Sequence, residues 1–357
     1  MQDLEILYEL ENKNITFYDR KLQISSKRLL IKGIKKSGKT HLIYDYLSNF
    51  KPEEYLYMDL LDERVTLLHV KNDLDAFVKK NHISLLVIEN YDPDIVLPDI
   101  PEIILTSNKL NLHVENFDEK ILYPLDFEEF IAFDRKHSNI EQLFNNYANH
   151  GTFPQIVLNH ENNLHRNMQD LIHLIIDDRQ KHILFKKFCE LQSTKISLFQ
   201  IYNQLKSSIK ISKDKLYKSV EELENESLLF LVQKYNSPNS NKKVFLIDFA
   251  IKNAMSFKKD FIKRFENILF LELFKKNLEI FYTDFIDLYV PKLNLAIMCL
   301  PFSPQNVIEA KIKKNLSHFK EMDISVIEVV SLGNEEEFML ENLTCKIVPF
   351  WEWALRE

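Results

Sequence analysis

Residues 28–40 read RLLIKGIKKSGKT and hold two of the four glycines in this chain of 357 residues. The stretch opens with a short apolar run that is typical of a buried strand, and the segment after it, THLIYDYLSNF (40–50), places apolar residues at helical spacing. Gly33 to Thr40 match the pattern GxxxxGK[ST] at every constrained position. The order strand, glycine loop, helix predicts a loop whose backbone N–H groups surround phosphates. The alternative is a lysine-rich surface turn.

This pattern assigns a role to most residues of the loop. Gly33 and Gly38 would let the backbone approach the phosphates without a Cβ in the way. The Lys39 ammonium would neutralise the β and γ phosphates, and the Thr40 hydroxyl would ligate Mg²⁺, so the predicted cofactors are ATP and Mg²⁺. The predicted nucleotide-binding residues are Gly33, Ile34, Lys35, Lys36, Ser37, Gly38, Lys39, Thr40 and His41.

Apolar runs alternate with helical patterns after this loop, which is the arrangement of an α/β fold. Strands separated by helices form a parallel, doubly wound sheet that binds its ligand at the carboxyl ends of the strands. The fold class that we expect is therefore α/β with a P-loop NTPase parallel sheet. The predicted strands are 28–33, 53–62, 84–90 and 102–108, with 120–125 as the candidate for a fifth, and the predicted helix between the second and third is 71–82.

The end of the third predicted strand carries the residues expected to complete the site. A working NTPase places an acid there for the magnesium shell and often a second acid that polarises the attacking water. Here Glu89 can serve the ion, but the next residue is Asn90, which cannot accept a proton. Asp92 and Asp94 are alternative carboxylates in a loop-like segment. We expect tight ATP binding with slow or absent hydrolysis.

The fourth predicted strand ends in the polar residues Thr106, Ser107 and Asn108. They could orient the γ-phosphate or the water, or they could be ordinary turn residues at the end of a strand. The predicted catalytic residues are Lys39, Glu89 and Asn108, and the predicted metal ligands are Thr40 and Glu89.

Composition narrows the class of protein. With 45% hydrophobic and 28% charged residues the chain has the balance of a soluble globular protein. The formal net charge of -7 argues against a protein held on DNA by a general positive field, but it leaves room for a local basic patch. No apolar run approaches the roughly 18 residues of a membrane span, and charges occur from the third residue onward. We expect a cytoplasmic protein with no membrane partner.

Several further segments, taken in order, resemble one group of proteins. They are YLYMDLLDER (55–64), LYPLDFEEF (122–130), LFNNYANHGTFPQIV (143–157), VFLIDFAIKNA (244–254), FENILFLEL (265–273) and KIVPFWEWAL (346–355). Together with the glycine loop they resemble prokaryotic AAA-type, STAND-like P-loop ATPases that carry a winged helix and a C-terminal domain of restriction-endonuclease-like fold. Thr152 stands where that group usually has a second glycine.

The resemblance implies four domains. These are a P-loop ATPase domain at 1–150, a helical lid at 151–181, a winged helix at 182–250 and an endonuclease-like C-terminal α/β domain at 251–357. In a winged helix the third helix, here within 212–228, would enter the major groove of DNA. Its first half is basic and its second half is acidic, so DNA contact competes with a role as spacer or protein contact. The lysines of this basic cluster are Lys206, Lys210, Lys213, Lys215, Lys218, Lys242 and Lys243.

The C-terminal domain lacks part of the nuclease site that the resemblance implies. Asp287 stands where the first acid is expected, but the next predicted strand has Ile297, Met298 and Cys299 in place of Glu-x-Lys. The letters EAK at 309–311 fall in a helical pattern, so we interpret them as surface charge. Nuclease activity is therefore not expected.

Two functions remain open from the sequence. The first is a nucleotide-dependent switch in which ATP or ADP in the glycine loop alters contact with an unknown protein partner. The alternative is an ATP-regulated DNA-binding or DNA-processing protein that uses the winged helix and the C-terminal domain.

Overall fold

The structure is a computed structural model that describes residues 2–9, 16–134, 138–159, 163–206 and 209–356. The chain forms two compact units, one made of residues 1–124 with 225–227 and the other of residues 125–224 with 228–357. Within the described ranges no helix has the length and apolar character needed to cross a bilayer.

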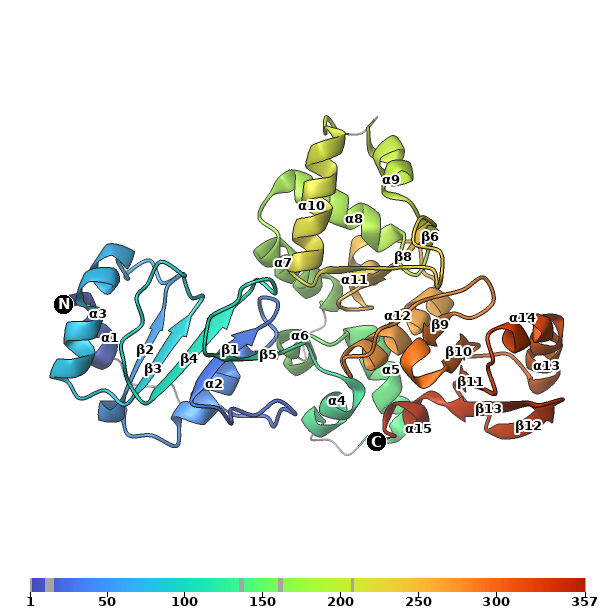
Figure 1. Ribbon diagram of the computed structural model, residues 1–357, viewed down its shortest axis with the longest axis horizontal. Helices are drawn as coiled ribbons and strands as arrows, with labels where there is room; N and C mark the ends of the chain where they lie inside the picture. The colour runs from blue at the N-terminus through green and yellow to red at the C-terminus, as the bar shows by residue number, and fades with distance from the viewer. Residues whose placement is uncertain (1, 10–15, 135–137, 160–162, 207–208, 357) are drawn as a thin grey trace. The chain divides into compact units, whose positions relative to one another are not determined.

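The first unit is built on a five-stranded parallel sheet with the order β2-β3-β4-β1-β5 (Figure 1). Its strands are β1 Arg28–Lys32, β2 Tyr55–Asp59, β3 Leu85–Glu89, β4 Glu102–Ser107 and β5 Asp118–Ile121. Its helices are α1 Gln2–Glu9, α2 Lys39–Leu47, α3 Leu67–Lys80 and the 3-10 turn η1 Pro52–Glu54.

Both faces of this sheet are apolar because both are covered by helices. Along β1, Leu29 and Ile31 pack with Leu42 and Ile43 of α2 on one face. Leu30 points to the other face and belongs to the cluster that contains buried residues of α1 and α3. Successive side chains of a strand alternate between faces, so a run of consecutive apolar residues produces a strand buried on both sides.

The predicted α/β fold class is confirmed by this sheet. The fifth strand, expected at 120–125, lies slightly earlier at Asp118–Ile121. Because β1 lies between β4 and β5, the loop after β1 meets the carboxyl ends of both neighbours, where open α/β sheets bind their ligands.

The second unit contains the remaining elements (Figure 1). Its helices are α4 Phe127–Phe133, α5 Ile140–His150, α6 Pro154–Leu158, α7 Leu164–Ile175, α8 Arg179–Glu190, α9 Leu198–Leu205, α10 Lys213–Asn225, α11 Ile251–Met255, α12 Phe261–Phe274, α13 Gln305–Lys314, α14 Leu316–Glu321 and α15 Phe350–Ala354. Its strands are β6 Lys195–Ile196, β7 Leu229–Val232, β8 Lys242–Leu246, β9 Leu288–Val290, β10 Leu295–Cys299, β11 Val326–Ser331, β12 Glu336–Leu340 and β13 Leu343–Pro349, with the 3-10 turn η2 Pro291–Leu293.

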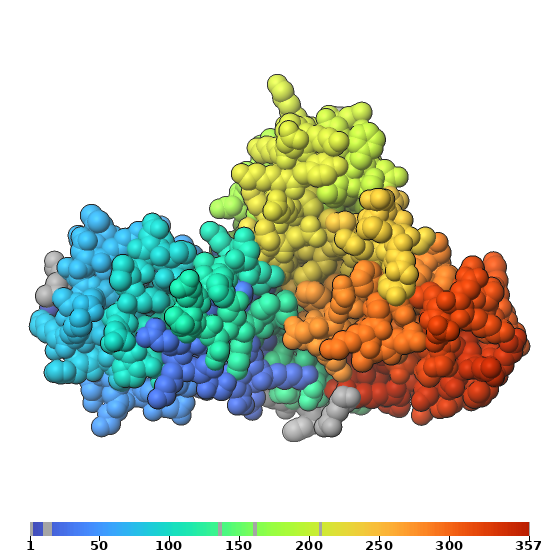
Figure 2. Space-filling model, viewed as in Figure 1, coloured from blue at the N-terminus to red at the C-terminus, as the bar shows by residue number. Residues whose placement is uncertain are grey.

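Two sheets organise this unit. One has the order β12-β13-β11-β10-β9 and is parallel at its centre, and the other is the small antiparallel sheet β6-β8-β7 beside α8, α9 and α10. In Figure 2 the yellow, orange and red segments of this unit form one continuous body. The apolar segment 278–282 belongs to neither sheet, and its residues Phe281 and Tyr282 take part in isolated bridges.

Four of the segments that carry the family resemblance meet in one aromatic cluster. The ring of Phe350 lies 5.0 Å from those of Phe127 and Phe144, and the ring of Tyr147 lies 5.1 Å from Phe127 and 4.8 Å from Phe249. Offset and edge contacts of this kind stabilise a core beyond simple burial. These segments therefore have a structural role in joining α4, α5 and α15.

The cluster also bears on the predicted domain boundaries. Helices α4 and α5 lie inside the predicted first domain, 1–150, but they belong to the second compact unit. The compact unit and the evolutionary domain are different divisions of a chain, and the boundaries at 150, 181 and 250 stay a prediction.

Candidate nucleotide-binding site

The glycine loop follows β1 and has the backbone conformation that its glycines permit. Gly38 has φ 106° and caps α2, and Lys36 has φ 69°. Gly33 has φ 152°, and a Cβ there would lie 2.3 Å from the carbonyl oxygen of Leu122, which follows β5. A side chain at residue 33 would therefore push the loop away from β5, which explains why glycine is required.

Lys39 lies at the centre of the loop. Its Nζ donates to the carbonyl oxygens of Gly33 at 2.6 Å and Ile34 at 2.9 Å, and to Asn108 Oδ1 at 2.9 Å. Burial lowers the pKa of Lys39 to about 8, against the opposing effect of the Glu89 charge. An ammonium held on neutral oxygens in a buried loop is poised to bind an anion.

The predicted metal ligands are in contact with each other. Thr40 Oγ1 donates to Glu89 Oε2 at 2.9 Å, and the hydroxyl of Tyr57 donates to Glu89 Oε1 at 2.7 Å. Burial raises the pKa of Glu89, and these two hydrogen bonds oppose that rise. The Thr40 hydroxyl and the Glu89 carboxylate thus form an oxygen pair of the kind that Mg²⁺ prefers.

A chain of hydrogen bonds runs along the carboxyl ends of three strands. Asn108, after β4, accepts from Lys39 and donates through Nδ2 to Asn90 Oδ1 at 2.7 Å. Asn90, after β3, donates through its own Nδ2 to Asp59 Oδ1 at 2.7 Å, at the end of β2. Both Asn90 amide atoms are therefore engaged, one of them with the Asp59 carboxylate.

The other predicted residues divide between the site and its surroundings. Asp94 pairs with Lys71 of α3 and Asp92 accepts from the Asp94 backbone, so this carboxylate pair stabilises its own loop. Thr106 Oγ1 accepts from the Asn90 backbone N–H and the Ser107 carbonyl accepts from the Gly33 N–H, so both residues fix the shape of the site. His41, on α2, is exposed.

The loop is suited to a phosphate chain on several independent grounds. The first turn of α2, which begins at Lys39 directly after the loop, has backbone N–H groups with no intrahelical partner. The hydroxyl of Ser37 is buried and has no hydrogen-bond partner among the described residues. No group of three or more His, Cys, Asp or Glu side chains that could hold a metal by itself occurs in the described ranges. A magnesium ion here would depend on phosphate oxygens as well as Thr40 and Glu89.

Sequence reasoning missed three residues of this site. Asp59 and Tyr57 lie on β2, and their alternation with buried residues of YLYMD was the available signal, since the carboxyl end of that strand places Asp59 opposite Glu89. Arg20 donates to the carbonyl oxygens of Ser37 at 2.8 Å and Tyr123 at 2.7 Å. Contacts to backbone oxygens leave no signature in the sequence.

The C-terminal region that was compared with a nuclease holds a separate cluster. Asp287 Oδ2 accepts from the Cys299 backbone N–H at 2.8 Å, and Glu266 of α12 pairs with Lys243 of β8. A cavity of about 210 Å³ is lined in part by Glu266, Asp287 and Lys311. Burial raises the pKa of Glu266 to about 7. Lys311, one of the residues interpreted as surface charge, is half-buried at the wall of this cavity.

The basic cluster predicted around the third helix of the winged helix is smaller than expected. Lys213, Lys215 and Lys218 are exposed on the first half of α10, and Lys213 lies 5.6 Å from the centre of the Phe199 ring. Lys243 is buried and pairs with Glu266, so it is withdrawn from the surface. The exposed basic face therefore consists of Lys213, Lys215 and Lys218 on α10, together with Lys206 and Lys210 before it.

Comparisons with known proteins find distant relatives. No family profile matches the chain. An uncharacterized protein of Methanocaldococcus jannaschii is 24% identical, with 99% of this chain and 96% of that protein covered. An uncharacterized protein of Haemophilus influenzae is 23% identical, with 69% of this chain and 74% of that protein covered. These proteins are similar to the chain along most of their length.

Solved structures overlap with the chain only loosely. A Walker-type ATPase of Pyrococcus abyssi superposes with a TM-score of 0.46 at 13% identity, covering 64% of this chain and 90% of that one. The Aeropyrum pernix ORC1 protein, solved in complex with DNA, has a TM-score of 0.31 at 12% identity, covering 65% and 87%. Superpositions this loose assign no function.

Proposed function

We propose that the chain binds ATP with Mg²⁺ in the loop Gly33–Thr40 and acts as a nucleotide-dependent switch with slow or absent hydrolysis. The observation that carries the proposal is the position of the Lys39 ammonium, held by Gly33, Ile34 and Asn108 beside the Thr40–Glu89 pair. Calorimetric titration of the wild type and Lys39→Ala with ATP and ADP tests it.

Different residues would bind the phosphates and the magnesium ion. The loop amides and the α2 N-terminus would hold phosphate oxygens, and Lys39 would exchange its carbonyl partners for them. Thr40 and Glu89 would hold the magnesium ion, which supplies charge neutralisation between the phosphates when it is bound. Asn108 already contacts Lys39, so a movement of Lys39 would change the hydrogen bonds of Asn108 to Asn90 and of Asn90 to Asp59.

Slow hydrolysis is supported by the environment of Asn90. A general base must reach the attacking water and accept its proton, and an amide cannot do so. Both amide atoms of Asn90 are committed to Asp59 and Asn108. Glu89 carries the hydrogen bonds of Thr40 and Tyr57, so its carboxylate is committed as well.

The pKa of Lys39 makes ATP affinity dependent on pH. With a pKa of about 8 in the free protein, Lys39 is mostly charged at pH 7 and mostly neutral near pH 9. Bound phosphates favour the charged form, so binding above pH 8 requires the uptake of a proton. We expect ATP affinity to fall as the pH rises from about 7 to 9, up to roughly tenfold per unit. Titrations in buffers of different ionisation enthalpy measure the proton uptake, and a flat profile with no uptake would contradict it.

The switch is supported by contacts between the loop and the segment that leads into the second unit. Arg20 links the Ser37 carbonyl of the loop to the Tyr123 carbonyl after β5. Gly33 touches the neighbouring Leu122 carbonyl so closely that no Cβ would fit. A movement of the loop on binding phosphates would therefore reach residues 122–123 directly.

Residues 122–125 form a connector between the two units, and its far end, Leu125, is fixed within the second unit. The Leu125 N–H donates to the Thr152 carbonyl at 2.9 Å, and Lys275 Nζ donates to the Leu125 carbonyl at 2.6 Å. Thr152 in turn donates its backbone N–H and hydroxyl to the buried Asp248. Only Pro124 separates the loop contact at 123 from the anchor at 125, so a displacement at 123 would act at the junction with the second unit.

Arg20→Ala is expected to separate nucleotide binding from its effect on the connector. ATP affinity should stay within about threefold, since Arg20 donates to a backbone oxygen of the loop, that of Ser37. Hydrogen exchange measured with and without ATP should show protection of the loop in both proteins. Protection changes in residues 122–130 should occur in the wild type and be lost in the variant.

Arg28→Ala provides the matched control, because Arg28 is half-buried and pairs with Asp99 at 3.7 Å, away from the loop. This variant should keep the exchange response of 122–130. An Arg20→Ala protein that still shows the full response would rule out transmission through this side chain.

DNA binding is the second candidate function, and one observation favours it. The exposed first half of α10 presents Lys213, Lys215 and Lys218 beside the aromatic side chains of Phe199 and Tyr217. Lysine with aromatic side chains suits phosphate and base contact. Duplex binding that weakens steeply with salt and is changed by ATP would favour this function over a protein partner.

A further inference from the structure

A half-buried arginine with no counterion among the described residues lies in the second unit, away from the glycine loop in the sequence. Arg264, in the first turns of α12, has an Nε that is buried and lacks a hydrogen-bond partner among the described residues. Its guanidinium lies 5.2 Å from the centre of the Phe261 ring, and its NH1 approaches Asn149 Oδ1 at 3.5 Å. Burial lowers the pKa of Arg264, and no carboxylate opposes that effect.

Such a side chain is unfavourable in the unliganded protein. A guanidinium removed from water needs a partner, and an unpaired one destabilises the fold by several kcal/mol in the least solvated sites. The five N–H donors of arginine form a planar fork that matches carboxylate and phosphate oxygens. The unpartnered Nε of Arg264, on a cation at the wall of a cavity, therefore points to a counterion supplied by a ligand.

The cavity next to Arg264 has a volume of about 510 Å³, within the range of small-molecule sites. Its walls are the C-terminal end of α5, the start of α7, the region of α11 and the start of α12. The donor groups that line it besides Arg264 are Asn146, Asn149, His150, His165, Asn253 and Lys259.

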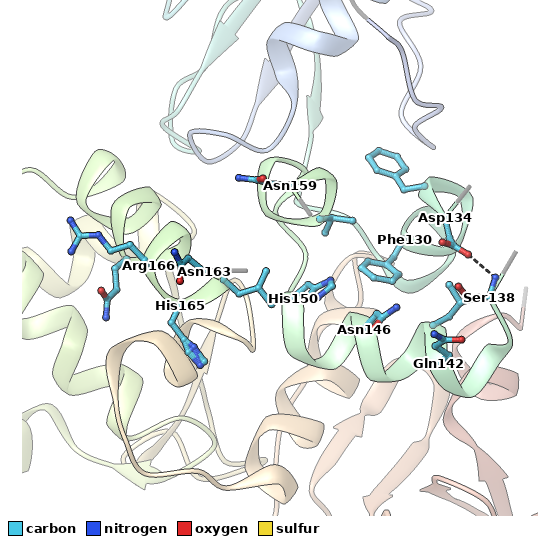
Figure 3. A pocket seen from close by; sticks show the side chains of 15 residues that line it. Phe130, Asp134, Ser138, Gln142, Asn146, His150, Asn159, Asn163, His165 and Arg166 are labelled. Carbon is cyan, nitrogen blue, oxygen red and sulfur yellow. Dashed lines mark hydrogen bonds between the residues drawn. The ribbon is translucent and has the colours of Figure 1, made fainter. Parts of the chain in front are cut away.

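Figure 3 shows part of this wall from the side of an adjoining pocket. Asn146 and His150 lie on successive turns of α5, and His165 projects from α7. These three residues line both cavities, so they form the rim that the two share.

One acid also lines the cavity, but its charge is already matched. Asp260 caps α12 by accepting from the Lys263 N–H at 3.2 Å, and its other oxygen lies 3.7 Å from Lys263 Nζ. The described lining residues therefore carry two positive charges, Arg264 and Lys259, and one negative charge, Asp260, which already accepts from the start of α12. This balance favours an anion over a neutral ligand or a cation.

We propose that this cavity binds a small phosphate monoester, with its phosphate on Arg264 and Lys259. A phosphate group carries three acceptor oxygens and close to two negative charges, which can satisfy both cations and the neighbouring imidazole and amide donors at once. A carboxylate offers one charge and two oxygens. The remaining volume, lined by Asn149, Asn253 and Phe261, accommodates the organic part.

The test uses the full-length chain carrying Lys39→Ala, in which the response of the glycine loop to phosphates is expected to be weakened. Thermal unfolding is measured with inorganic phosphate, ribose 5-phosphate, AMP and succinate as probes, because a ligand that binds only the folded state raises the melting temperature. We expect at least one phosphate probe to raise the melting temperature and succinate to leave it unchanged. Ribose 5-phosphate and AMP show whether a sugar or a nucleotide supplies the phosphate.

Arg264→Gln and Lys259→Gln should each weaken binding of that probe by tenfold or more. The matched control is Lys258→Gln, which removes an exposed lysine next to the cavity that does not line it. Without ligand, Arg264→Gln should leave the melting temperature unchanged or raise it, since it removes an unpaired buried charge.

Three results would overturn the proposal. One is the absence of a shift with every phosphate probe, or an equal shift with succinate. Another is an equal response of Arg264→Gln, Lys259→Gln and Lys258→Gln. The third is a large fall in the unliganded melting temperature of Arg264→Gln together with unchanged binding in Lys259→Gln, which would assign Arg264 a structural role.

Discussion

Lys39→Ala is expected to weaken ATP binding by roughly 10- to 100-fold. Hydrogen bonds from a charged donor contribute about 1.5–3 kcal/mol each, and every 1.4 kcal/mol changes an affinity tenfold. The Lys39 ammonium is buried in the loop on three neutral oxygens, so phosphates would gain a strong, poorly screened partner. Calorimetric titration with ATP and ADP in the presence of Mg²⁺ measures the change.

Lys36→Ala is the matched control for this loss. Lys36 is an exposed lysine of the same loop with a left-handed backbone, and its removal should change ATP affinity by less than about threefold. A melting curve of each variant shows that the fold is retained. If folded Lys39→Ala binds ATP with the same affinity as the wild type, the loop is not the nucleotide-binding site.

Exchanging Asp59 and Asn90 is expected to raise ATP turnover at least tenfold. The double variant Asp59→Asn, Asn90→Asp keeps the net charge and the hydrogen bond between the two positions with donor and acceptor reversed. It moves the carboxylate from the end of β2 to the end of β3, next to Glu89. A positioned general base contributes about 10²–10⁴ in rate. Asn90 has φ 55°, and aspartate is among the residues that tolerate this left-handed backbone.

Steady-state phosphate release at saturating ATP measures this turnover, with Asp59→Asn alone as the control that removes the carboxylate without replacing it. The control should show no gain. A wild-type ATP turnover of roughly 1–10 per second, a rate common among enzymes, would show that hydrolysis is not impaired. If the double variant binds ATP normally but hydrolyses it no faster than the wild type, Asn90 does not limit the reaction.

Much of the first unit could be predicted from the sequence. Its strands are short apolar runs buried on both faces, and their spacing by helical patterns determines a parallel sheet. The loop was found because the constraints on Gly33, Gly38, Lys39 and Thr40 are local, set by backbone geometry and by the charge of the ligand. Asn90 was identified in the same way, from its place directly after a strand.

The second unit was harder to predict because its organisation depends on long-range packing. The segment 278–282 has the apolar pattern of a strand, yet its backbone makes only isolated bridges. Helices α4 and α5 follow the P-loop sheet in the chain but pack with α15 through Phe127, Phe144 and Phe350. Periodicity indicates which face of an element is buried, but it does not indicate which other element that face packs against.

By itself, the sequence determined the α/β sheet, the glycine loop and the amide at the position after Glu89, because each depends on residues within a few positions of one another. Only the tertiary structure decided that Asp59 lies beside Asn90, that Arg20 joins the loop to Tyr123, and that Arg264 faces a cavity without a counterion. Those arrangements depend on chain segments far apart in sequence and on backbone oxygens that every residue possesses, so no residue pattern records them.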